Sequence, residues 1–247
     1  MAEGKLALVT GAGGGMGQAT VERLASDGFR VAAMDIDENG LDAAVAAAGA
    51  EARGWPCDQT DEAKVREAVA EIEAAMGPVD ALVNLIGWCG TTRFHEEDSA
   101  YWKKIIAINF ESILYVTHPV LQTMIERKQG KIVNVSSDAG RVGTSGEVVY
   151  SAMKAGLIAF AKSLARENAR YNINVNTVCP GPTDTPLLQA EIDEDPELIR
   201  RMVRLIPFRR LGQPADMAAA ISFFCSPDSD YITGQAMSVS GGLTMVD

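Results

Sequence analysis

Residues 6–17 read LALVTGAGGGMG, an apolar run that passes directly into a turn rich in glycine. The run Leu6–Thr10 has the length and composition of a buried strand, and Gln18–Asp27 after the turn has helical patterning. A second apolar run, Arg30–Met34, ends at Asp35. Strand, glycine turn, helix and strand form a βαβ unit, in which the turn lies at the carboxyl edge of a parallel sheet.

This glycine turn indicates a nucleotide site. Glycines let a pyrophosphate approach the backbone, and the first turn of the following helix offers free N–H groups at the positive end of its dipole. Asp35, 18 residues after Gly17, lies where a carboxylate can accept hydrogen bonds from a ribose diol. An ordinary tight turn is the alternative for the glycines alone. The flanking strands and Asp35 together favour a dinucleotide.

The alternation of helix and strand continues along the chain. Strand segments that are apolar throughout indicate a parallel sheet with both faces covered. The length of 247 residues and the hydrophobic content of 47% suffice for one core. We therefore predict a single α/β domain, residues 1–247, built as a doubly wound (Rossmann-type) parallel sheet with helices on both faces. The further strands are predicted at Ala52–Cys57, Val79–Ile86, Lys131–Val135, Ile173–Val178 and Ala236–Ser240.

The composition argues against several classes of protein. The net charge is −11, and basic residues cluster only at Arg200–Arg210, so we expect no nucleic-acid partner. The four cysteines are far apart, and the first residues do not resemble a secretory leader, which predicts a reducing, cytoplasmic location. No uninterrupted apolar run approaches the roughly 18 residues that a membrane span needs. Neither histidine has a second ligand at metal spacing, so we expect no metal.

Residues 148–154 read VVYSAMK and carry a candidate general base. On a helix, Tyr150 and Lys154 lie on the same face, one turn apart. An ammonium about 4 Å from a phenolate gains roughly 4 kcal/mol at an effective dielectric near 20, which would bring a tyrosine pKa from about 10 toward 7. A packed ring beside a solvated amine is the alternative. Asn109, inside the helical stretch Trp102–Met124, either faces water or meets a specific buried partner.

Two stretches are candidates for the substrate side of the site. Residues 88–95, WCGTTRFH, break the period and are predicted to form a loop at the carboxyl edge, where ligands bind in such folds. Their aromatic side chains are pocket walls or ordinary packing. Prolines end the sixth strand, and residues 183–210 form an excursion that we predict to be a substrate lid. The candidate pocket residues are Trp88, Phe94, Thr144, Leu187 and Met202.

Several motifs together resemble those of the short-chain dehydrogenase/reductase family over the whole chain. Residues 10–17 match its TGxxxGxG cofactor loop, and Ser137, 13 residues before Tyr150, completes its Ser…YxxxK set. Asn109 matches its helix asparagine. The turns at Pro180-Gly181, Thr183–Thr185 and Gly241-Gly242 are also similar. Two departures stand out: Leu85 and Ile86 replace Asn and Ala of the usual NNAG, and the tail reads VSGG instead of VDGG.

This resemblance implies a set of roles. Tyr150 is then the proton donor or acceptor, Ser137 holds the substrate oxygen, and Lys154 binds the nicotinamide ribose and lowers the tyrosine pKa. Asn109 then holds a water that relays the proton. The implied cofactor-binding residues are Gly11, Gly14, Gly15, Met16, Gly17, Asp35, Ile36, Cys57, Asp58, Asn84, Gly87, Tyr150, Lys154, Pro180, Gly181, Thr183 and Thr185.

The cofactor is predicted to be NAD, because a 2′-phosphate would stand against Asp35 while Gly14 and Ile36 supply no cation. The resemblance further implies a homotetramer that acts on a small-molecule substrate. Within the family the chain most resembles bacterial dehydrogenases of cyclic alcohols, of 1-arylethanols and of 2-hydroxycyclohexanecarboxyl-CoA, which implies a small cyclic or aryl-substituted secondary alcohol as substrate. The alternative substrate is 2-hydroxycyclohexanecarboxyl-CoA or a 3-hydroxyacyl-CoA or acyl-carrier-protein thioester, for which Arg200–Arg210 could bind a CoA phosphate or form an ordinary solvated basic helix. A sensor that binds NAD without turnover is the alternative class.

Overall fold

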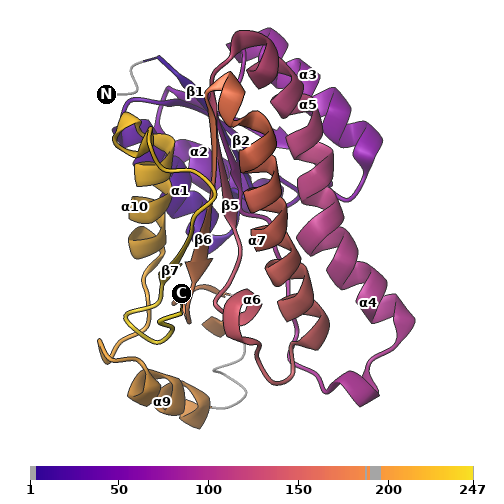
Figure 1. The fold of residues 1–247 in the computed structure, drawn as a ribbon, viewed down its shortest axis with the longest axis vertical. Helices are drawn as coiled ribbons and strands as arrows, with labels where there is room; N and C mark the ends of the chain where they lie inside the picture. Colours follow the sequence, from indigo (N-terminus) through magenta and orange to yellow (C-terminus); the bar gives the residue numbers. More distant parts are fainter. Residues whose placement is uncertain (1–3, 187, 190–195, 247) are drawn as a thin grey trace.

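The computed structural model describes residues 4–186, 188–189 and 196–246. Seven parallel strands form one sheet in the order β3-β2-β1-β4-β5-β6-β7 (Figure 1). The strands are β1 (Leu6–Thr10), β2 (Arg30–Asp35), β3 (Ala52–Pro56), β4 (Ala81–Asn84), β5 (Gly130–Val135), β6 (Ile173–Pro180) and β7 (Ala236–Val239). This order confirms the predicted doubly wound α/β domain.

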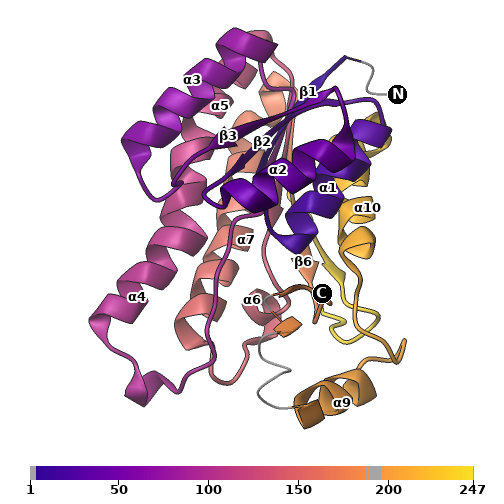
Figure 2. The same cartoon turned by 180° about the vertical axis from the view of Figure 1, so that it is seen from behind.

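Helices cover both faces of the sheet. Figures 1 and 2 show α1, α2 and α10 on one face and α3, α5 and α7 on the other. The long helices are α1 (Gly15–Ser26), α2 (Glu38–Ala48), α3 (Glu62–Met76), α4 (Ser99–Ile106), α5 (Ser112–Arg127), α7 (Val148–Asn168), α9 (Pro196–Leu205) and α10 (Pro214–Cys225). Successive residues of β1 enter opposite cores: Val9 packs with α1 and α10, and Leu8 with α3 and α5. Apolar burial on both faces explains why the strands read as continuous apolar runs.

The predicted helical stretch Trp102–Met124 is helical throughout, and its hydrogen-bond pattern changes in the middle. A π-helical turn, Ala107–Glu111, separates α4 from α5 and contains the buried Asn109. The Asn109 side chain donates to the Ile105 carbonyl, 3.0 Å away. Single π turns inside α-helices are rare and occur frequently at functional sites.

The excursion after β6 is anchored where it begins and ends. Thr183 pairs with Gly212 in an isolated bridge, so the segment between them leaves and rejoins the sheet edge at one place. Helix α9 lies below that edge in Figure 1. Leu187, predicted as a pocket residue, lies outside the described residues.

Helix α7 and the 3-10 turn after it (Ala169–Tyr171) are long and apolar enough to cross a membrane, with a mean hydropathy of 1.3. The helix packs on β6 beside α4 and carries Tyr150 and Lys154. Only 28% of its most apolar window is buried within this chain. Most of this apolar window is therefore not buried by the sheet or by the rest of its own chain.

Candidate functional site

A cavity of about 810 Å³ lies at the carboxyl edge of β1, β2 and β4. Its walls come from the glycine turn, the end of β2, the segment after β3, the segment after β4 and the start of the excursion. The predicted residues that line it are Gly11, Gly14, Gly15, Met16, Asp35, Ile36, Cys57, Asp58, Gly87, Trp88 and Thr185.

Two positions of the glycine turn have no space for a side chain. Gly11 has a φ of +64°, and a Cβ there would lie 2.8 Å from the Ile86 nitrogen. A Cβ on Gly17 would lie 2.1 Å from the Gly11 carbonyl oxygen. Helix α1 begins after Gly14, which provides no side-chain cap, so the first N–H groups of the helix stay available for an anion. This arrangement fits the pyrophosphate of a dinucleotide.

Asp35 is held in position at the cavity wall. Its carboxylate accepts hydrogen bonds from the backbone N–H of Gly13, at 2.8 Å, and of Asp37, at 2.9 Å. The glycine turn itself therefore orients the carboxylate, as the predicted role of Asp35 in holding a ribose diol requires.

Some predicted cofactor residues do not line the cavity. Asn84 is fully buried, and its amide donates to Asn134 Oδ1 (2.9 Å) and Thr117 Oγ1 (3.0 Å). The β4–β5 register pairs Asn84 with Asn134, so its side chain is engaged inside the sheet and its predicted role in cofactor binding stays a prediction. The others outside the lining are Gly17, Tyr150, Lys154, Pro180, Gly181 and Thr183.

Several residues that line the cavity were not predicted from the sequence. Lys104 and Ile108 are one helical turn apart, a spacing that could have placed them on the face near Asn109. The Lys104 ammonium lies 3.6 Å from the centre of the Trp88 ring, a cation–π contact. The other lining residues missed were Gly13, Gln18, Asp37, Gly40, Gln59, Thr60 and Pro186, whereas Leu85 and Ile86 were expected beside the cofactor and also line the cavity.

The residues predicted to perform the chemistry converge at the ends of β4 and β5. A Cβ on Gly87 would lie 3.1 Å from Lys154 Nζ and 3.2 Å from Asn109 Oδ1, so both groups flank this glycine. The Asn109 amide also donates to the Trp88 carbonyl at 2.8 Å. Of the two possibilities that the sequence left open for Asn109, water or a specific buried partner, the structure shows the buried partner. Ser137 follows β5, and its Oγ accepts from the Ala139 N–H at 3.1 Å.

The effect of Lys154 on Tyr150 was predicted wrongly. The pKa of Tyr150 is raised, because its phenol is removed from water and lies near Cys89 and Glu147, while hydrogen bonding with Ser137 lowers it. The Lys154 ammonium lies 5.6 Å from the centre of the tyrosine ring and donates instead to the Val135 carbonyl at 3.1 Å. Burial lowers the pKa of Lys154 itself to about 8.

The predicted substrate-pocket residues do not form one group. Trp88 lines the cavity, with Tyr101 against its edge at a centroid distance of 6.0 Å. Phe94 is half exposed and stacks on Trp102 instead. Thr144 is exposed, and Met202 on α9 is partly buried; neither lines the cavity.

The protein combines a doubly wound sheet, this glycine turn and Asp35 at the cavity wall with Asn109, Ser137, Tyr150 and Lys154. This combination is typical of a class of dinucleotide-binding oxidoreductases. A family profile described as "Enoyl-(Acyl carrier protein) reductase" matches residues 11–244. The chain belongs to the short-chain dehydrogenase/reductase family.

Relatives match over almost the full length. The chain is 38% identical over 244 residues to the 3-oxoacyl-(acyl-carrier-protein) reductase FabG of Escherichia coli, covering 99% of both chains. It is 38% identical over 250 residues to the acetoacetyl-CoA reductase of an Acinetobacter species, covering 99% of this chain and all of that protein. The structure of a 3-ketoacyl-(acyl-carrier-protein) reductase from Brucella melitensis with NADH superposes with a TM-score of 0.92 at 30% identity, covering 99% and 100%.

Proposed function

We propose that this protein is a nicotinamide-dependent reductase of 3-oxoacyl thioesters, which forms the 3-hydroxyacyl thioester. The single observation that carries the proposal is the full-length identity of 38% to FabG and to an acetoacetyl-CoA reductase, together with the intact Ser137, Tyr150 and Lys154. This differs from the leading expectation from the sequence, a small cyclic or aryl secondary alcohol, and agrees with its alternative.

The chemistry follows from the positions of these side chains. Bound nicotinamide supplies the hydride. The Ser137 and Tyr150 hydroxyls would hold the carbonyl oxygen of the substrate, and the tyrosine would give it a proton as negative charge develops. The raised pKa of Tyr150 keeps the phenol protonated at neutral pH, which is the state that reduction requires. Lys154 and Asn109, on either side of Gly87, would hold the ribose hydroxyls and a water that returns the proton.

We further propose NADH as the cofactor, in preference to NADPH. Asp35, Asp37 and Asp58 are the acidic residues that line the cavity. A 2′-phosphate beside Asp35 would meet a like charge held in place by backbone N–H groups, a juxtaposition that costs several kcal/mol. Among the described residues that line the cavity, Lys104 is the one cation, and its ammonium lies on the Trp88 ring.

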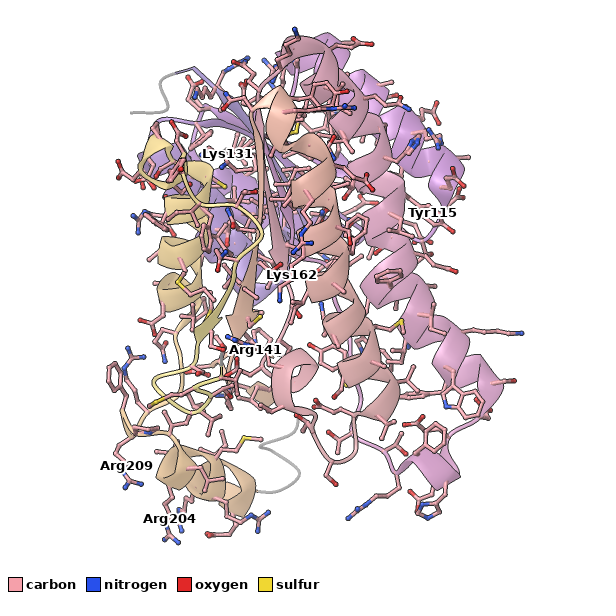
Figure 3. All side chains as sticks on the ribbon, viewed as in Figure 1. Tyr115, Lys131, Arg141, Lys162, Arg204 and Arg209 are labelled. Carbon is pink, nitrogen blue, oxygen red and sulfur yellow. The ribbon has the colours of Figure 1, made fainter. Side chains whose placement is uncertain are left out.

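Coenzyme A is the thioester carrier that the surface favours. Arg204 and Arg209 project from the end of α9 and the segment after it, away from the sheet (Figure 3). Both are exposed, and neither has a carboxylate at ion-pair distance within the part of the chain that the structure describes. Two exposed apolar residues, Leu205 and Phe208, lie between these arginines in the sequence. The Arg209 guanidinium donates a hydrogen bond to the Arg204 carbonyl. Guanidiniums without an ion pair, on a protein of net charge −11, suit the phosphates of a CoA nucleotide.

A cyclic or aryl-substituted ketone is the second candidate substrate. The observation that favours it is the wall of Trp88, Leu85 and Ile108, which is aromatic and apolar. Such a surface suits a flat or alicyclic ring without polar groups.

The experiment is to follow NADH absorbance with acetoacetyl-CoA, an acetoacetyl thioester without the nucleotide, alicyclic ketones and aryl ketones. We expect the highest kcat/KM for acetoacetyl-CoA. Faster turnover of a ring-containing ketone would replace the thioester proposal with the second candidate. Binding of NADH without turnover of any substrate would favour a sensor.

We also propose self-association, in line with the homotetramer expected from the family resemblance. Helix α7 keeps most of its apolar window outside the core of its own chain. On the same side, Phe110 and Phe160 meet edge to face at 6.3 Å and remain partly exposed. Sedimentation should give a tetramer for the wild type and a smaller species for Phe160→Glu. A stable wild-type monomer would contradict the proposal.

A further inference from the structure

Asp138, the residue directly after Ser137, has an unusual environment. It is only 5% exposed, and its backbone N–H donates to the Pro180 carbonyl at 2.9 Å. Its Oδ1 accepts from Ser238 Oγ at 2.5 Å, while its Oδ2 is buried without a hydrogen-bond partner among the described residues. Burying a carboxyl oxygen without a partner destabilises the folded state, so packing alone would favour an apolar residue here.

Arg141 reaches the same hydroxyl from α6 (Ala139–Val142). Its guanidinium donates to Ser238 Oγ at 2.9 Å and to the Ala236 carbonyl at 3.3 Å, both on β7. It also donates to the Val246 carbonyl at 2.7 Å, near the carboxyl end of the chain. Figure 3 shows Arg141 beside α6. Ser238 therefore joins a carboxyl and a guanidinium that stand on either side of it.

This network encloses the segment that holds Ser137. The Ser137 carbonyl accepts from Gly140 and its hydroxyl accepts from Ala139, so the start of α6 fixes the serine. Arg141 ties that same turn to β7, and Asp138 ties it to β6 and β7. Movement of the turn would displace the serine hydroxyl, and a misplacement of about 1 Å near the reacting atoms can cost 10²-fold in rate.

We infer that Asp138, Ser238 and Arg141 form a positioning network that fixes the Ser137 hydroxyl for the reaction and links it to the carboxy-terminal tail. The inference rests on the proposed reductase function. Polar residues that packing does not favour are expected where a site must be held in one geometry. None of the three touches the reacting atoms, so each acts through Ser137.

The test compares Arg141→Met with Arg127→Met. Arg127 is the matched control, because it too is partly buried and donates to a backbone carbonyl (Val79) and a partner side chain (Asp80), both at 3.1 Å, but at the opposite edge of the sheet. We expect Arg141→Met to lower kcat for thioester reduction by about 10- to 100-fold with the Kd of NADH little changed. Arg141→Lys should recover part of the loss, and Arg127→Met should lower Tm without lowering kcat.

Hydrogen exchange provides a readout that needs no substrate. Exchange in the peptide 136–143 should be faster in Arg141→Met, and in the milder Ser238→Ala if the first variant does not fold, while Arg127→Met leaves it unchanged. If exchange is faster in these variants but the wild type reduces no thioester, the positioning network stands and the proposed reductase function is rejected. Unchanged exchange in this peptide, or an equal loss of kcat in the Arg127 control, would overturn the positioning role.

Discussion

The Lys154 ammonium donates a hydrogen bond to the Val135 carbonyl across 3.1 Å and thereby joins the buried face of α7 to the last residue of β5. Ser136 makes the reverse contact, since its hydroxyl donates to the Lys154 carbonyl at 2.7 Å. Both contacts hold the helix that carries Tyr150 against the strand that leads to Ser137. The lysine has a structural partner as well as a proposed ribose partner.

The pKa of about 8 for Lys154 makes stability depend on pH. Below pH 8 the side chain is protonated in both states, and between 8 and its ordinary value of 10.5 the unfolded chain holds a proton that the folded chain has lost. The free energy of unfolding therefore rises with pH in that window. The free energy of unfolding of the wild type, minus that of Lys154→Met, should increase by about 2 kcal/mol between pH 7 and pH 9.5. Urea unfolding at both pH values measures this difference. A constant difference would show that the lysine keeps its ordinary pKa.

Gly17 and Gly14 should respond differently to alanine. A Cβ on Gly17 meets the Gly11 carbonyl at 2.1 Å, whereas a Cβ on Gly14 meets the same oxygen at 3.7 Å, an ordinary contact. We expect Gly17→Ala to displace the turn, abolish NADH binding and lower Tm by several degrees. Gly14→Ala should change Tm little. Equal effects of the two variants, seen by calorimetry and NADH titration, would mean that the turn is looser than its geometry indicates.

Asp35 should determine the choice of cofactor. Wild type should favour NADH over NADPH by at least about tenfold in kcat/KM, since a like-charge contact costs several kcal/mol. Asp35→Ser removes the charge and should reduce that preference, and adding Ile36→Arg should reverse it. A wild-type preference for NADPH would contradict the role given to this carboxylate.

The arginines near α9 should matter only for substrates that carry a nucleotide. The double variant Arg204→Gln, Arg209→Gln should raise KM for acetoacetyl-CoA several-fold, because charge-assisted phosphate contacts are lost. The same enzyme should show an unchanged KM for an acetoacetyl thioester without the nucleotide. Arg53→Gln, an exposed arginine on β3, is the control. Equal KM changes for both thioesters would separate these arginines from CoA recognition.

The sequence predicted what depends on local pattern. The turn from Gly11 to Gly17 could be located because strand, turn and helix follow one another in the chain, and steric conflict restricts the choice of residue there. The strands were predicted because burial on both faces leaves apolar runs. The spacing of Tyr150 and Lys154 correctly indicated one helix.

Features that depend on tertiary packing could not be predicted. Whether Asn84 faced the cavity depended on its register with Asn134, 50 residues later in the chain. The distance from Lys154 to the phenol depended on how α7 lies against β5, which brings the Val135 carbonyl within reach of the ammonium. Burial then dominated the pKa of both side chains, a contribution that helical spacing does not reveal.

The most direct measurement is kcat for the NADH-dependent reduction of acetoacetyl-CoA by the wild type and by Tyr150→Phe. The phenylalanine keeps the ring and removes the proton donor, so kcat should fall by about 10²- to 10⁴-fold while the Kd of NADH stays within about twofold. Turnover by Tyr150→Phe close to that of the wild type would contradict the assignment of Tyr150 as the proton donor.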